Sequence, residues 1–318
     1  MVFLTAFSKV LPVFLLILLG VLLRRIRLMR PESVADIKKL VVNVTLPAAL
    51  FLAFSQVTIE LHYLLIVVTV FAACWLVLLL GGRLHGPLRI DSPFMPSLLT
   101  GFEAGMMGYA IYGAVYGADN IWRFGIIDLG QVLFVFFVLV PGLKRLSTGA
   151  TSFRETLLGF LKTPVILAIL AGLLASQIGL SGLLAASSIG DSLLETVRLV
   201  GSMTTPLVAI AIGYELQLRS GELSKPVRTI AVRLLIWVPA GLAFSLLMVG
   251  RLLHLDVAFQ AAVLTMAILP PPFVIPLFMP NADEADVNFV VNSLTLAILV
   301  TLVAYPLIPA LLPPFGSP

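Results

Sequence analysis

The sequence predicts an all-α membrane protein that crosses the bilayer many times, on three observations. Of its 318 residues, 60% are hydrophobic and 11% are charged, whereas soluble domains average about 45 to 50% and about 25%. The apolar residues form runs of roughly 20, the length at which an α-helix crosses about 30 Å of hydrocarbon. Basic residues cluster in alternate connections between these runs.

Ten runs are long enough to be expected as spans. The second and seventh contain polar residues and a proline, so their apolar signal is the weakest. The runs are 8–24, 38–55, 63–82, 94–117, 122–143, 156–178, 197–217, 230–250, 257–280 and 286–312.

The basic residues predict the orientation of the chain. Lys and Arg accumulate in cytoplasmic connections, so the connections after spans one, three, five and seven are expected in the cytoplasm. Both termini then lie outside, and the expected location is a cell (inner) membrane. These connections hold sixteen of the twenty basic residues: Arg24, Arg25, Arg27, Arg30, Lys38, Lys39, Arg83, Arg89, Lys144, Arg145, Arg154, Lys162, Arg219, Lys225, Arg228 and Arg233.

The two halves of the chain share a repeat. The stretch LPVFLLILLGVLLRRIRL, residues 11–28, aligns without gaps on TPVILAILAGLLASQIGL, residues 163–180. Nine of the eighteen positions are identical, and Gly20 falls on Gly172. The match predicts that the first and sixth spans have equivalent places in the fold.

The second and seventh spans continue the repeat. KLVVNVTLP at 39–47 meets RLVGSMTTP at 198–206, where Thr45 falls on Thr204. Because each half holds five spans, an odd number, the second half enters the membrane inverted relative to the first. Secondary transporters with this symmetry bind substrate where the halves meet, often on broken helices. The halves are 1–150 and 151–318.

The fourth and ninth spans are the expected broken helices. LPPPFVIP, residues 269–276, contains four prolines, and residues 100–117, TGFEAGMMGYAIYGAVYG, are glycine-rich. Broken backbone at membrane depth is tolerated only inside protein or beside a wet cavity. Carbonyls freed by the prolines suit a cation, and the following half-helix would direct its positive N-terminal end at an anion. Aligning Thr100 with Thr265 sets Gly105 and Met106 opposite Pro270 and Pro271, with Pro272 beside them.

Glu103 is the strongest single candidate, because ionisable residues inside a membrane are costly and usually functional. One interpretation is a proton-coupling group whose protonation follows its access to either side. The other is a protonated structural glutamate bonded to exposed backbone at the glycine-rich break.

Several further polar side chains lie within the expected spans. Asp128 and Gln131 share a face of the fifth span, where Asp128 is either a cation or proton site or a carboxylate facing a helix N-terminus. Glu215 is expected to reach the headgroups or to pair with a basic neighbour such as Arg219. The other four candidates either contact ligand or cross-link helices, as neutral polar residues in spans commonly do: Asn43, Thr45, Asn288 and Asn292.

Other functions find little support in the sequence. A dispersed net charge of +4 does not indicate a nucleic-acid partner, and His62, His85 and His254 are too scattered for a metal site. We find no phosphate-binding GxxxxGK[ST] loop and no catalytic constellation. An enzyme is therefore not expected, and neither is a cofactor, apart from H+ or Na+ as a coupling ion.

The order of the motifs resembles the auxin efflux carrier family of membrane transporters and its bacterial members. The first span reads LLGVLLRR and the second NVTLPAALF; AIGYEL lies in the seventh, and LPPP is followed by DEAD and VNSLTL. The chain departs from the family pattern at Glu103, where asparagine is common, and at Ala110, where proline is common.

The resemblance implies ten helices in two inverted repeats, with the fourth and ninth crossing at unwound points. Helices at 8–55 and 156–217 would form a scaffold that often dimerises, and those at 63–143 and 230–312 a moving transport domain. The implied function is transport of small, auxin- or carboxylate-like organic anions by elevator motion in the lipid bilayer. The alternatives are a sodium-coupled symporter resembling the bile acid symporters, or a non-transporting receptor on the same fold.

Overall fold

The computed structural model describes residues 2–57, 60–147, 152–219, 222–279 and 282–313, and every element in these ranges is helical. Six helices there are long and apolar enough to cross a membrane, and one helix pair bent by 60° is a seventh. The chain is therefore built as a multi-pass membrane protein.

The helices of the first half follow the predicted runs. They are α1 (Val2–Arg25), α2 (Pro31–Leu40), η1 (Val41–Thr45), α3 (Leu46–Phe54), α4 (Tyr63–Gly81), η2 (Gly82–Leu84), α5 (His85–Leu88), α6 (Met95–Leu99), η3 (Ala104–Gly108), α7 (Tyr109–Tyr116), η4 (Ala118–Asn120), α8 (Ile121–Phe134), η5 (Val135–Leu139) and α9 (Val140–Ser147).

The second half has a similar series. It comprises α10 (Phe153–Leu161), α11 (Pro164–Gln177), α12 (Leu180–Ala185), α13 (Ser188–Ser202), α14 (Thr204–Glu215), α15 (Ser224–Ala243), η6 (Phe244–Leu252), α16 (Val257–Ile268), η7 (Ile275–Phe278), α17 (Glu284–Ala304) and α18 (Leu307–Leu311).

Two boundaries differ from the sequence prediction. The helix expected at 197 begins at Ser188, where the Ser187 side chain accepts the Gly190 N–H at 3.0 Å. Its first turns carry exposed charges, including Asp191, so they give no apolar signal. The ninth helix ends at Ile268 rather than 280, because three prolines follow and proline cannot continue a helix.

Close glycine contacts hold one side of the molecule together. α1 packs against α14, and α11 packs against α3. A Cβ atom on Gly20 would lie 2.1 Å from the Ile210 carbonyl oxygen, and one on Gly172 would lie 2.7 Å from that of Phe51. Only glycine permits backbones this near, as is usual where helices associate in membranes.

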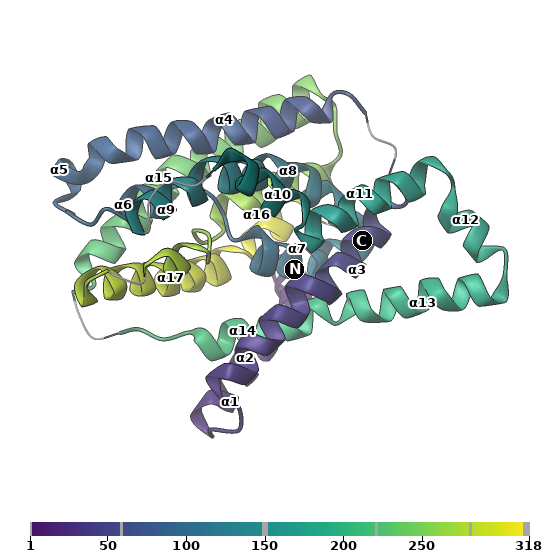
Figure 1. Ribbon diagram of the computed structural model, residues 1–318, viewed down its shortest axis with the longest axis horizontal. Coiled ribbons are helices and arrows are strands. Elements are labelled where there is room, and N and C mark those ends of the chain that lie inside the picture. Colours follow the sequence, from purple (N-terminus) through teal and green to yellow (C-terminus); the bar gives the residue numbers. More distant parts are fainter. Residues whose placement is uncertain (1, 58–59, 148–151, 220–221, 280–281, 314–318) are drawn as a thin grey trace.

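The other side of the molecule surrounds the two expected breaks. α4 packs against α6 and α8, and α15 packs against α16 and α17, with α4, α15 and α17 on the side away from α12 and α13 (Figure 1). Leu64, Val68, Trp75 and Leu79 of α4 are about half exposed. A row of large apolar side chains open to the surroundings fits a lipid-facing helix.

Candidate functional site

The two broken helices meet in the interior. α6 ends at Leu99 and helix resumes at Ala104, while α16 ends at Ile268 and Leu269–Pro272 are not helical. The Glu103 N–H donates to the Pro270 carbonyl oxygen at 2.9 Å. This hydrogen bond joins the break in one half of the chain directly to the break in the other.

The matching positions of the breaks differ from the alignment of Thr100 with Thr265. The last helical residues are Leu99 and Ile268, so the correspondence moves by four residues. Gly101, with φ of +64°, lies against Pro272, and Gly105 lies beyond the break inside η3. Several glycines at similar spacing give no unique register, which is why the sequence placed Gly105 and Met106 opposite the prolines.

The Glu103 side chain links both broken segments. Its Oε1 accepts the Met106 N–H at 3.1 Å, and its Oε2 accepts the Phe273 N–H at 2.6 Å. The residue is 9% exposed. Each carboxyl oxygen thus binds a backbone donor from a different half of the chain.

The expected half-helix after the prolines is wrong. Pro270, Pro271 and Pro272 are followed by a turn and by the single 3-10 turn η7, which has too few aligned peptides for a strong dipole. The N-terminal end at the crossing belongs instead to η3, and Glu103 already caps it. A positive helix end is therefore not left open to an anion at the prolines.

Arg233 is the main residue of the site that the sequence analysis missed. It was assigned to a cytoplasmic connection, but it is the tenth residue of α15 and only 1% exposed. Its guanidinium donates to four backbone carbonyls at the two breaks, at distances of 2.5 to 3.4 Å: Leu98, Gly101, Leu269 and Pro270. The expectation that these carbonyls are free for a cation is therefore wrong. The sequence offered one weak signal, that Arg233 lies within the apolar run 230–250, but a basic residue this near the start of a run usually reaches the headgroups.

Asp128 and Gln131 belong to the same site. Asp128 is 2% exposed and is the eighth residue of α8; it accepts hydrogen bonds from the Tyr109 hydroxyl at 2.9 Å and the Gln131 amide at 3.1 Å. The Gln131 Oε1 in turn accepts the Phe102 N–H at 3.4 Å. The chain of contacts runs from α8 to the break, so Asp128 is not a carboxylate at a helix N-terminus.

The remaining candidates differ in burial and in partners. Thr45 is buried and accepts a 3.0 Å hydrogen bond from Thr204, whereas Asn43 is exposed and donates to the Lys39 carbonyl oxygen. Asn288 is half-buried on α17. The structure therefore does not bring Asn43 to the crossing.

Asn292 and Glu215 have backbone or charged partners near the connection after α14. Asn292 is buried and makes two hydrogen bonds with the main chain of Arg219, accepting its N–H at 2.7 Å and donating to its carbonyl oxygen at 3.2 Å. Glu215 pairs with Lys38 at 2.8 Å rather than with Arg219. The helix ends at Glu215, so the expected four-residue spacing on one face does not apply.

Two cavities flank the crossing. The first, about 500 Å³, is lined by Arg24, Lys38, Arg219 and Glu215 and reaches Phe273 next to the prolines; we call it the basic cavity. The second, about 440 Å³, is lined on its polar side by Gln56, Asp119, Arg198, Thr204 and Thr205 and reaches Tyr109.

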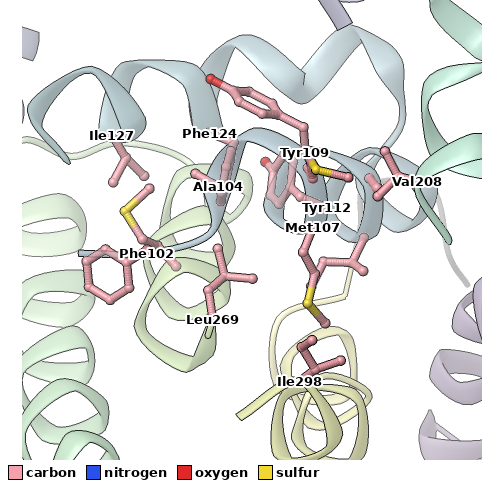
Figure 2. Close-up of a cluster of buried hydrophobic side chains, with 14 of the residues drawn as sticks. Phe102, Ala104, Met107, Tyr109, Tyr112, Phe124, Ile127, Val208, Leu269 and Ile298 are labelled. Carbon is pink, nitrogen blue, oxygen red and sulfur yellow. The ribbon is translucent and has the colours of Figure 1, made fainter. Parts of the chain in front are cut away.

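A layer of buried apolar residues lies between the α14 residues that line the two cavities. Val208 of α14 follows Thr204 and Thr205 of the second cavity and precedes Tyr214 of the basic cavity. Figure 2 shows Met107 of η3 pointing toward Ile298 of α17, with Leu269 beside it. All four side chains belong to one buried hydrophobic cluster.

The fold and the site define a multi-pass helical membrane protein in which two broken helices meet in the interior. Residues 5–159 match the family described as membrane transport protein. This match confirms the predicted resemblance of the chain to the auxin efflux carriers. It is also similar to an uncharacterized transporter of Methanothermobacter thermautotrophicus, 23% identical over 320 residues that cover 96% of this chain and 98% of the relative.

Proposed function

We propose that the protein is a secondary transporter of small organic anions that works by alternating access around the crossing of its fourth and ninth helices. The observation that carries the proposal is the crossing itself, where Glu103 bonds to Pro270 and Phe273 beside a basic cavity. The cavities lie on two sides of an apolar layer, as a carrier with alternately opened sides requires.

Pseudo-symmetric contacts support a ten-helix inverted repeat. The sequence repeat pairs Gly20 with Gly172, and its second part, extended without gaps, pairs Phe51 with Ile210. Gly20 touches the Ile210 carbonyl, and Gly172 touches that of Phe51. Each half therefore supplies one glycine to the other half at an equivalent place.

A second pair of contacts repeats the same symmetry. Arg24 donates to the Leu216 carbonyl oxygen at 2.6 Å, and Ser176 donates to that of Val57 at 2.8 Å. In the two alignments Arg24 corresponds to Ser176 and Leu216 to Val57. Different side chains thus preserve one contact, which supports inverted halves over a chance match.

These contacts support a division into a scaffold and one moving part. Helices at 8–55 and 156–217 pack on one another through glycines, and those at 63–143 and 230–312 surround the crossing. We propose that the first set is the scaffold, joined in a homodimer, and that the second moves as an elevator. In an inner membrane with both termini outside, the basic cavity opens to the cytoplasm.

The charge of the basic cavity supports an anionic substrate. Among the described residues that line it, three are basic, Arg24, Lys38 and Arg219, and one is acidic, Glu215. A cavity lined by one sign of charge concentrates solutes of the opposite sign. We propose a small carboxylate, with H+ as the coupling ion through Glu103, because a sodium ion would compete with Arg233 for the carbonyls at the breaks.

The test is flux in liposomes across a panel of mono- and dicarboxylates. We expect uptake that depends on pH or on membrane potential. The variant Arg219→Gln, which reduces the positive charge of the basic cavity, should raise the KM for the substrate. Lys38→Gln and Lys39→Gln are a matched pair of variants, each of which removes one positive charge. Only Lys38 lines the basic cavity, so only Lys38→Gln should raise the KM. Folded protein without any such flux would contradict the proposal.

The two alternatives give different results. A symporter that resembles the bile acid symporters would respond to sodium but not potassium, and Glu103→Gln would weaken that response. A receptor would bind ligand with no flux, and Glu103→Gln would change no flux assay.

A further inference from the structure

We propose that Arg233 is the resident cation of the crossing, filling the site that the freed carbonyls would otherwise offer to a metal ion. In this respect the inference deepens the proposed function: a transport cycle around this crossing needs no bound sodium. The charge that holds the broken helices together is covalently part of the protein.

The geometry of the carbonyls supports this assignment. Converging backbone carbonyl oxygens are typical ligands of hard cations, and ion filters are built from rings of them. At the crossing, two such oxygens come from each broken helix, those of Leu98 and Gly101 and those of Leu269 and Pro270. A single guanidinium reaches all four.

The surroundings of the guanidinium are closed. Arg233 is 1% exposed, and the Phe102 ring lies 5.0 Å from its guanidinium carbon. One turn further along α15, the Trp237 indole N–H donates to the Leu99 carbonyl oxygen at 2.7 Å. Arg233 and Trp237 thus donate hydrogen bonds to the carbonyl oxygens that have no helical partner at the end of α6.

Arg233 is a positioning residue in this scheme. It lies on α15, and its bonds reach the breaks of both the fourth and the ninth helices. Three segments that are far apart in sequence therefore move together. A side chain without a donor at 233 would leave the carbonyls unpaired, and a small one would also leave a space in which an added cation could bind.

The experiment compares thermal unfolding of the full-length purified protein and its variants in different salts. Arg233→Ala is measured in guanidinium chloride at about 20 mM, far below the molar range that unfolds proteins, and in NaCl, KCl and choline chloride at equal ionic strength. We expect a lower Tm that guanidinium raises again and choline does not. The wild type should have the same Tm in sodium as in potassium.

Further variants separate charge from packing. Trp237→Phe removes a neighbouring hydrogen bond without removing a charge, so its Tm should fall with no selective recovery in guanidinium. Arg233→Lys keeps a cation and should retain more stability than Arg233→Gln; this pair serves as the test if Arg233→Ala does not fold.

Two results would overturn the inference. One is a wild-type protein stabilised by sodium over potassium, and the other is an Arg233→Ala protein that responds to guanidinium no more than Trp237→Phe does. Because these measurements need no substrate, they are independent of the proposed transport. If the protein shows no flux but guanidinium still raises the Tm of Arg233→Ala, only the transport proposal is contradicted.

Discussion

The Thr204 hydroxyl donates a 3.0 Å hydrogen bond to the hydroxyl of Thr45, and both residues are buried. The sequence repeat pairs these same two threonines with each other. Residues related by a two-fold axis touch only near that axis. The bond therefore places the pseudo-symmetry axis of the proposed repeat between η1 and α14.

The Thr45–Thr204 bond should be measurable as a coupling energy. In a double-mutant cycle of Thr45→Val and Thr204→Val, we expect about 0.6 kcal/mol and at most roughly 1.7, the range for such bonds in membrane proteins. The measurement is the free energy of unfolding in detergent. The control cycle combines Thr45→Val with Thr196→Val, because Thr196 is exposed and bonds within its own helix. The changes in unfolding free energy of these two variants should be additive. Additive effects of Thr45→Val and Thr204→Val would contradict a direct bond.

The glycine contacts predict equal sensitivity in the two halves. Gly20→Ala and Gly172→Ala would each place a methyl group against a backbone carbonyl of the neighbouring helix, so each should destabilise by about 1 to 3 kcal/mol, as overpacking does. Gly182→Ala, in a helix with open space around it, should be neutral or slightly stabilising. Thermal unfolding of the three variants is the test; a Gly20→Ala protein as stable as Gly182→Ala would contradict the packing.

The two glycines near Glu103 should behave differently. Gly101→Ala would strain a residue at φ of +64° and set its Cβ 2.7 Å from Pro272, and the left-handed conformation alone costs about 1 to 2 kcal/mol. In the part of the chain that the structure describes, an alanine Cβ at position 105 meets nothing nearer than the Glu103 carboxylate at 3.9 Å, so the Tm of Gly105→Ala should be unchanged. Both Tm and KM are to be measured. A rise in KM for Gly105→Ala without loss of stability would place Gly105 on the substrate path; equal Tm losses would contradict the distinction.

The sequence predicted the elements that depend on local pattern. Apolar run length located the helices, and proline and glycine content located both breaks, which meet at Glu103 and Pro270. The pairing of Thr45 with Thr204 required only an alignment. Each of these features can be recognised from the sequence of one segment or from the alignment of two.

Features that depend on tertiary packing were not predictable in the same way. Arg233 lies near the start of an apolar run, where a basic residue usually reaches the headgroups, and only the packing of α15 against both breaks shows it buried. Asn43 lies in η1, a π-helical turn that adds a residue to the helical turn and shifts the face on which side chains emerge.

Glu103 provides the last prediction, because its two oxygens both accept backbone N–H groups. A glutamine has one acceptor oxygen, so its amide group would oppose either Met106 or Phe273, and an unmade buried bond costs about 1 to 3 kcal/mol. We expect Glu103→Gln to lower the unfolding free energy by that amount and to remove the pH dependence of flux. Glu195→Gln is the control, since this exposed carboxylate pairs only with Arg198 among the ion pairs of the described residues and such pairs contribute about 0 to 1 kcal/mol. Unchanged stability and an unchanged pH profile in Glu103→Gln would show that the carboxylate neither joins the breaks nor carries the coupling proton.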